Sequence, residues 1–297
     1  ISGGSGTASA SSAVSFTTYE NILEAVASTT NIDMVATKSI TLNESLTFAQ
    51  TRGQSVTFTA SGGNISFTDA SDTIQTSGGN IVMNASGILS VGKMKTNGGN
   101  ITLTGGDFRL SGALDAGNGT LTILGVSGET IGLDGITAGT TGTTVSTICD
   151  ASACGLTLTQ NELNSITAAK LVIGDSSSGD IYVDGVNTSH ISGGVTFNSS
   201  GSGGSVKFGA GGSVLKVATI NAGNGVTING DLSITGSSVF NADYDSSGTG
   251  TFTLAATKAL TALTISISAN DVDILGATSS GTGSTTVAVS DGGTIGL

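Results

Sequence analysis

A phrase built on glycine and asparagine returns along this chain at a fixed spacing. It reads Gly78-Gly79-Asn80 ahead of Ile81 and recurs as Gly98-Gly99-Asn100 ahead of Ile101. A third, less exact copy, Gly117-Asn118-Gly119, precedes Leu121. The three apolar residues are therefore 20 positions apart each time. A fixed period of about 20 residues around one short strand is typical of a stacked solenoid, because no single unit can bury its apolar face alone. We expect Ile81, Ile101 and Leu121 to form one internal ladder of the core.

The composition fits a body of continuous β-ladders. The chain has 47 Gly and no Pro; each Pro would remove a backbone donor, and Gly supplies positive-φ corners between strands. Only 4% of residues are aromatic, yet Val, Ile and Leu recur at strand spacing. We predict an all-β fold, a single β-solenoid of the right-handed parallel β-helix type, with about 12–14 turns.

Charge argues against two classes of partner. Nine Lys and Arg stand against 21 Asp and Glu, for a net charge of −12, whereas nucleic acid and anionic membrane both attract clustered cations. No apolar run approaches the ~20 residues of a membrane span, and no basic stretch followed by an apolar segment marks a signal peptide. Because the chain starts at Ile1, we expect a mature product or a piece of something longer.

Two capping boxes predict short lateral helices. The first, Thr17 to Glu20, predicts a helix over about 17–27, and the second, Thr159 to Glu162, a helix over 159–168. We expect residues 1–30 to be a Gly/Ser-rich connector plus the first helix. Residues 31–297 form the predicted solenoid, with a lateral insertion near 134–170 that carries the second helix.

The amino-acid sequence of residues 120–190 resembles that of a known family. The carrying segments are Ser127-Gly128-Glu129-Thr130-Ile131-Gly132-Leu133, Leu156-Thr157-Leu158-Thr159-Gln160-Asn161-Glu162-Leu163 and Leu171-Val172-Ile173-Gly174-Asp175. They are similar to the repeat body of filamentous-haemagglutinin-like secreted exoproteins, which are right-handed parallel β-helices exported by two-partner secretion. That family's secretion domain carries Asn-Pro motifs, so we expect it to be absent from this chain. The resemblance implies an extracellular or cell-surface protein with an adhesive or structural role, with no catalytic residue and no cofactor.

Candidate chemistry is sparse. Asp180 and Asp184, and likewise Asp271 and Asp273, stand at strand period two and so share a face. Such pairs can bind a cation or act as acid and base, but a solubilising outer face is the interpretation that we favour. His190 is the only histidine, too few ligands for a zinc site. We expect no enzyme and no metal; a polysaccharide-active β-helix enzyme is the remoter alternative.

Cys149 and Cys154 are the only cysteines and enclose four residues. In an exported protein we expect a local disulfide between them, with two free thiols as the alternative. Seven Asn-x-Ser/Thr sequons are glycosylation candidates in a eukaryote and turn asparagines in a bacterium. They are Asn43, Asn64, Asn84, Asn100, Asn118, Asn187 and Asn198.

Paired threonines offer a binding alternative. The pairs are Thr57–Thr59, Thr102–Thr104, Thr120–Thr122, Thr157–Thr159 and Thr251–Thr253. Regularly spaced threonine hydroxyls on a flat solenoid face can bind ice. Thr is, however, also favoured in β-strands in general, so outward-facing threonines need no binding role. The pairs do not lie at a constant distance from the predicted corners. This favours the interpretation that they are ordinary strand residues. A carbohydrate-binding module is a further alternative, although aromatic residues for its groove are few.

The end of the chain repeats an internal phrase. Thr130-Ile131-Gly132-Leu133 returns as Thr294-Ile295-Gly296-Leu297. An uncapped solenoid end exposes strand edges and an apolar cross-section, both of which template another copy. We therefore expect an extracellular structural or adhesive protein whose copies join head to tail, with surface carbohydrate as a second partner.

Overall fold

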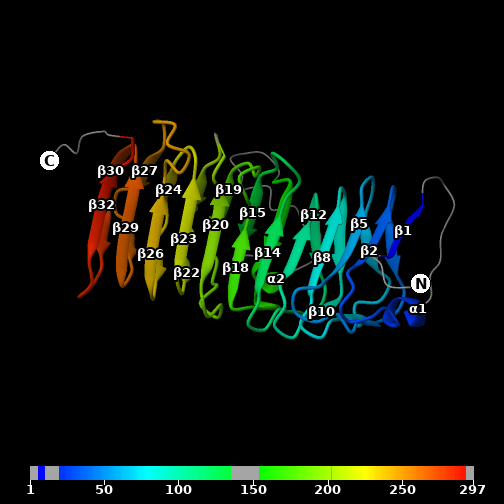
Figure 1. Ribbon diagram of the computed structural model, residues 1–297. Coiled ribbons are helices and arrows are strands. Elements are labelled where there is room, and N and C mark those ends of the chain that lie inside the picture. The colour runs from blue at the N-terminus through cyan, green and yellow to red at the C-terminus, as the bar shows by residue number, and fades with distance from the viewer. Residues whose placement is uncertain (1–5, 11–19, 135–153, 202, 292–297) are drawn as a thin grey trace. The chain divides into compact units, whose positions relative to one another are not determined.

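The fold is all-β, and parallel strands stack as a β-solenoid of about 10 turns (Figure 1). This computed structural model describes residues 6–10, 20–134, 154–201 and 203–291. The predicted architecture is confirmed, but the predicted 12–14 turns are too many. The turns are longer than 20 residues in places, as where Ser238 pairs with Ile265 in the next turn. The chain forms two compact units, residues 1–126 with 165–170, and residues 127–164 with 171–297.

Unit 1 consists of three parallel stacks of strands. The first contains β1 (Gly6–Ala10), β2 (Ile32–Ala36), β5 (Ser55–Ala60), β8 (Asn80–Ala85), β11 (Ile101–Thr104) and β14 (Thr120–Leu124). The second contains β3 (Ile40–Leu42), β6 (Ile65–Phe67), β9 (Ile88–Val91) and β12 (Asp107–Leu110). The third contains β4 (Leu46–Thr47), β7 (Thr73–Gln75), β10 (Lys93–Lys95), β13 (Leu114–Asp115) and β17 (Ile166–Thr167).

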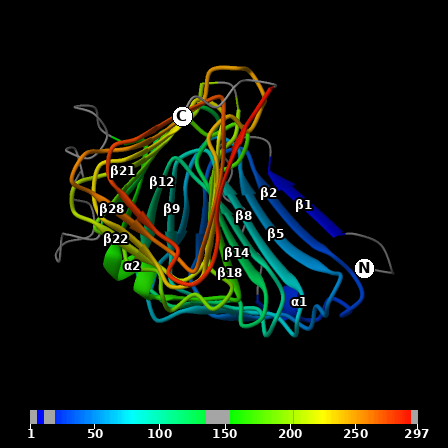
Figure 2. The same ribbon diagram turned by 90° about the vertical axis from the view of Figure 1, so that its left-hand side faces the viewer.

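Unit 2 also has three stacks, and its successive turns superimpose when viewed end-on (Figure 2). The first contains β18 (Lys170–Ile173), β20 (Val195–Ser199), β23 (Ala218–Ala222), β26 (Ser237–Asn241), β29 (Thr264–Ala269) and β32 (Thr285–Val289). The second contains, in spatial order, β16 (Leu156–Thr159), β15 (Ile131–Asp134), β19 (Ile181–Asp184), β21 (Val206–Phe208), β24 (Val226–Ile228), β27 (Thr251–Leu254) and β30 (Asp271–Ile274). The third contains β22 (Ser213–Leu215), β25 (Leu232–Ile234), β28 (Ala259–Thr261) and β31 (Ala277–Ser279).

The 20-residue period builds the core of unit 1. Ile81 pairs with Ile101, Ile101 pairs with Leu121, and all three side chains are fully buried, so they form the internal ladder that the period predicts. Their neighbours Val82, Thr102 and Thr122 alternate outward. The alternation places apolar side chains inside the coil and polar ones on its surface, as a half-buried strand requires.

Each residue of the recurring glycine–asparagine phrase has its own task. Gly98 adopts a φ of 101°, which few residues other than glycine tolerate. Gly99 lies against the preceding turn so closely that a Cβ would overlap the carbonyl oxygen of Gly79. The Asn100 side chain accepts a hydrogen bond from the Thr120 N–H of the next turn at 2.9 Å. The phrase therefore makes the corner, permits close stacking and joins adjacent turns.

The two helices are shorter than predicted. α1 covers Glu20–Glu24 rather than 17–27, and the N-cap of its predicted capping box lies outside the described residues. α2 covers Gln160–Asn164 rather than 159–168. Its capping box is present, since Glu162 accepts hydrogen bonds from the Thr159 N–H and hydroxyl at 2.8 and 2.9 Å. The helix stops early because the following Ile166 is buried and pairs as a strand with Leu114.

Two predicted boundaries are wrong. Residues 6–10, assigned to a connector, form β1 and pair in parallel with β2. Within the insertion predicted near 134–170, residues 135–153 lie outside the described residues, but β16 and β17 belong to the sheets. Leu156 and Leu158 are fully buried, and this apolar alternation requires a place in the core rather than on its side. β16 takes its place beside β15, on the side away from β19, although it follows β15 in the chain.

Candidate functional site

The apolar core is open at the last described turn of unit 2. Val272 and Ile274 of β30, and Val287 and Val289 of β32, stand in inward register but remain half-buried. In the preceding turns the equivalent residues, such as Phe252 and Ile267, are almost fully buried. Since β30, β31 and β32 are the last strands of their stacks, this turn presents three strand edges around an apolar cross-section.

A buried aspartate fastens this turn to an earlier one. Asp243 follows β26 and is only 4% exposed. Its carboxylate accepts a 2.6 Å hydrogen bond from the Ser290 hydroxyl, just after β32, and bonds from the Ser247 and Gly248 N–H groups at 3.0 and 3.3 Å. Burial alone would raise the pKa of this carboxyl, but the hydrogen bonds outweigh burial, so its pKa lies below the ordinary value.

Local hydrogen bonding accounts for only part of this loop. Asp245 accepts the Ser247 N–H at 3.3 Å, an Asx hydrogen bond to the backbone two residues on. The bond from Ser290 to Asp243 crosses 47 residues, and no local pattern signals it. The two side chains meet only because the chain passes through the same stack again two turns later.

The Asp243 carboxylate should make stability depend on pH. Replacing Asp243 with Asn should lower the free energy of unfolding by about 2 kcal/mol at neutral pH, because the bonds to a buried charge are weakened. Since folding lowers this pKa, the carboxylate stabilises the fold above the unfolded pKa of about 3.9 and loses that effect as the pH falls through the folded pKa. Urea denaturation across pH should therefore show the difference shrinking below about pH 4. The exposed neighbour Asp245→Asn is the control, and a pH-independent difference would contradict the assignment.

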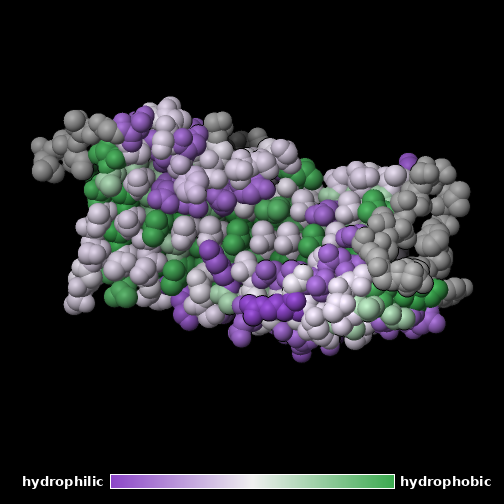
Figure 3. Space-filling model, in the orientation of Figure 1, coloured by the Kyte–Doolittle hydropathy of each residue, from purple (hydrophilic) through white to green (hydrophobic). Residues whose placement is uncertain are grey.

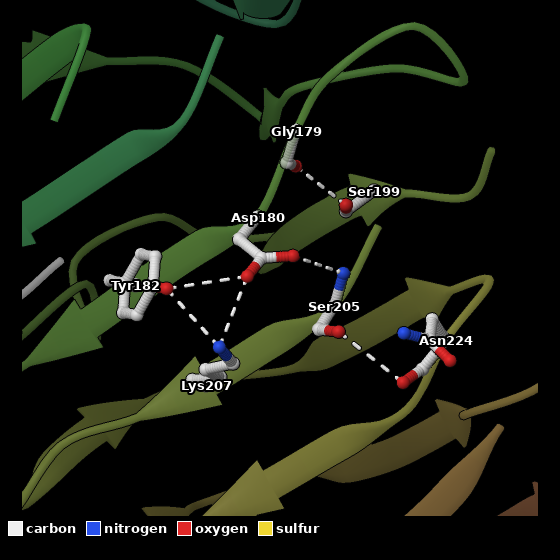
Figure 4. Close-up of polar contacts among 7 residues, drawn as sticks. All are labelled: Gly179, Asp180, Tyr182, Ser199, Ser205, Lys207 and Asn224. Carbon is white, nitrogen blue, oxygen red and sulfur yellow. Dashed lines mark hydrogen bonds and ion pairs between the residues drawn. The ribbon is translucent and has the colours of Figure 1, made fainter. Parts of the chain in front are cut away.

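A polar cluster lies on the outer face of the second stack of unit 2 (Figure 4). Asp180 and Lys207 form an ion pair at 3.1 Å, and the Lys207 ammonium also donates to the Tyr182 hydroxyl at 3.1 Å. The same ammonium lies 4.9 Å from the centroid of the Tyr182 ring. The second Asp180 oxygen accepts the Ser205 N–H at 2.9 Å. The cluster thus joins β19 to the turn that contains β21.

The predicted aspartate pairs do share outer faces, but neither pair converges on a common point with free carboxylates. The Asp184 side chain accepts the Gly211 N–H at 2.5 Å, so Asp180 and Asp184 each tie their turn to the next. Asp271 and Asp273 are exposed on β30, and Asp271 accepts the adjacent Val272 N–H. These contacts favour the interpretation that the aspartates stabilise and solubilise the coil.

Cys154 lies just before β16 at 8% exposure, near the Tyr182 side chain, and is disulfide-bonded. Cys149, the chain's only other cysteine, lies outside the described residues. The Cys149–Cys154 bridge stays a prediction. We expect alkylation to add mass to the intact protein only after reduction, whereas labelling of two thiols without reduction would contradict the bridge.

Most of the sequon asparagines make turn-to-turn or local hydrogen bonds. The Asn64 and Asn100 side chains accept backbone N–H groups of the next turn, Asn43 accepts the Thr68 hydroxyl, and Asn187 accepts Ser189. Such bonds are the role of a turn asparagine. The exposed members are Asn43, Asn64, Asn100, Asn118 and Asn187, while Asn84 and Asn198 are half-buried on outer strand faces.

The threonine pairs are better ordered than the sequence suggested. In the first stack of unit 1, Thr57 lies in the same column as Thr102 and Thr122, with Val82 between. The column beside it contains Thr59, Asn84 and Thr104. The expected lack of register is therefore wrong for the pairs Thr57–Thr59 and Thr102–Thr104, because turns of 25 and 20 residues both return to the same column. It holds for Thr120–Thr122, which is shifted by two residues, so that Thr122 aligns with Thr102 and Leu124 with Thr104.

His190 is exposed. In the part of the chain that the structure describes, no three His, Cys, Asp or Glu residues are grouped so as to hold a metal ion. A search of the same residues for a helix long and apolar enough to cross a membrane also found none. No protein-family model, no curated protein and no solved structure matches this chain.

Proposed function

We propose that this protein is an extracellular or cell-surface structural β-helix whose copies stack end to end into a filament or fibre. The open last turn of unit 2 carries the proposal. Among the described residues no further strand lies beside its edges, and its half-buried Val272, Ile274, Val287 and Val289 offer apolar surface. A strand edge of this kind templates the addition of another parallel strand.

The first turn of unit 1 also has open strand edges. β1 and β3 are the first strands of their stacks in unit 1. The third stack is partly protected, since Glu24 of α1 accepts the Thr47 N–H of its first strand at 2.5 Å. A second copy would therefore join through the first two stacks. The resemblance of the repeats to secreted exoproteins similar to filamentous haemagglutinin supports a structural or adhesive role.

A lysine in the open cross-section should block the filament. We expect the 297-residue chain to form fibres in negative-stain electron microscopy at micromolar concentration, and Val287→Lys to leave short particles. Burial of an unpaired ammonium at the junction opposes stacking. Ser279→Lys, which adds the same charge at an outward position of β31, should still form fibres. Monodisperse single particles of the unmodified chain would overturn the proposal.

The threonine columns of unit 1 favour a second candidate, an ice-binding module. Thr57, Thr102 and Thr122 share one column, and Thr59 and Thr104 the next, so their backbones lie at multiples of the ~4.8 Å strand spacing. Thermal hysteresis of a dilute solution that is lost in Thr102→Lys, but retained in Ser279→Lys, would favour this candidate over a fibre.

A further inference from the structure

One face of unit 2 carries no charge, although the unit as a whole is strongly acidic. The sequence of unit 2 contains 13 Asp and Glu and three Lys. None of them lies on the outward positions of β20, β23, β26, β29 and β32. Those positions are Asn198, Thr219, Asn221, Ser237, Val239, Asn241, Thr264, Ser266, Ser268, Thr286 and Ala288; Thr196 shares their register on β20 but is buried, so it adds no free surface. We call this set the neutral face; the corresponding side of the molecule in Figure 3 is largely white, with purple and green side chains among the white ones.

The margins of the neutral face bear two exposed apolar side chains. Leu263 directly precedes β29 and is 54% exposed, and Tyr244 follows β26 and is 53% exposed. Both belong to the same stack, because the Leu263 N–H donates to the Gly236 carbonyl and the Tyr244 N–H to the Ala222 carbonyl. One residue stands at the amino-terminal margin of the strands, and the other at the carboxyl-terminal margin. The two side chains do not form one contiguous patch, so they add apolar contact area only at the two margins of the neutral face.

We propose that the neutral face binds the neutral face of a second copy, side by side rather than end to end. A two-fold axis parallel to the stacking direction reverses the strands of the partner. It would bring Tyr244 of one copy opposite the Leu263 position of the other, in both directions, as a two-fold contact requires. Two flat sheets pack in this way at about 10 Å.

The distribution of charge on unit 2 favours a second copy of this chain as the partner of the neutral face. Like-charged molecules repel wherever their acidic surfaces meet, so the neutral face is where two copies of unit 2 approach at least cost. A polysaccharide is less suited, because stacking on sugar rings needs aromatic side chains; the outward positions of the neutral face contain none, and Tyr244 stands only at its margin.

The size of the face predicts weak pairing. Five strands at ~4.8 Å and about five residues each at ~3.3 Å span roughly 400 Å². This is about half of the ~800 Å² per partner in a standard stable interface. Single copies should therefore pair only at high concentration, whereas many copies along a fibre would associate laterally through multivalency.

Sedimentation velocity on the Val287→Lys chain tests the proposal apart from fibre formation. We expect a monomer–dimer equilibrium only at the highest soluble concentrations, because the face is smaller than a standard stable interface. Added NaCl should strengthen the dimer, because salt screens the repulsion between acidic copies. Val239→Lys and, separately, the exposed Ser266→Lys should each weaken dimerisation at least tenfold. Thr253→Lys, which adds the same charge on the outer face of β27, should leave it unchanged. Circular dichroism melting of each variant verifies that it folds.

Three results would overturn the proposal. The first is a chain that stays monomeric at the highest concentration in high salt. The second is a dimer that neither Val239→Lys nor Ser266→Lys weakens. The third is retention of the monomer on insoluble cellulose or chitin, lost in Val239→Lys, which would assign the neutral face to a polysaccharide. The test does not depend on whether the unmodified chain forms fibres.

Discussion

Replacing Ile101 with Asp should prevent cooperative folding of unit 1. The Ile101 side chain is fully buried between Ile81 and Leu121. A carboxylate at this position would have no cation to pair with in the apolar ladder, and the substitution also removes a large apolar side chain. Each effect costs several kcal/mol, so we expect a loss of about 5 kcal/mol or more. Thermal unfolding followed by circular dichroism measures it.

The adjacent residue supplies the control. Thr102 points outward from the same strand, so Thr102→Asp should change stability by less than about 1 kcal/mol. Equal losses for the two substitutions would mean that the inward and outward register of β11 is wrong.

A single methyl group at Gly99 should be the next most damaging change. A Cβ there would overlap the carbonyl oxygens of both Gly78 and Gly79. The obstacle is backbone on the preceding turn rather than a flexible side chain, so the two turns would have to separate. We expect Gly99→Ala to lower the free energy of unfolding by about 3 kcal/mol, within the range for overpacking.

Its neighbour separates crowding from backbone strain. Gly98 has a φ of 101° and nothing within 4 Å of where its Cβ would lie. Gly98→Ala should therefore cost only the strain of a positive φ, about 1–2 kcal/mol. Urea denaturation of both variants makes the comparison, and a larger loss for Gly98→Ala than for Gly99→Ala would contradict the stacking role of Gly99.

Periodic features of this chain could be predicted from its sequence because they depend on local geometry repeated at a fixed interval. The 20-residue spacing of Ile81, Ile101 and Leu121 predicted their stacking. The pattern Thr159 to Glu162 predicted a capping box whose bonds span three residues. Side-chain alternation follows from the strand itself, so inside and outside were predictable wherever strands were recognised.

Features that depend on how far each turn extends became visible only in the structure. Turns vary from 20 to 27 residues in the pairs Ile81–Ile101 and Ser238–Ile265, so the length of the intervening corner decides which outward residues share a column. This is why the alignment of Thr57 with Thr102 was missed. The position of β16 beside β15 likewise does not follow from chain order. It is decided by where the two leucines of β16 can be buried in the core.

The candidate site was predictable in kind but not in detail. Side-chain alternation indicated a coil of stacked strands, and any open stack of strands has strand edges at its last turn. The bond from Ser290 to Asp243 and the ion pair of Lys207 with Asp180 join residues 47 and 27 positions apart. Contacts at such separations depend on the summed lengths of the turns between them, and so only the tertiary structure decides them.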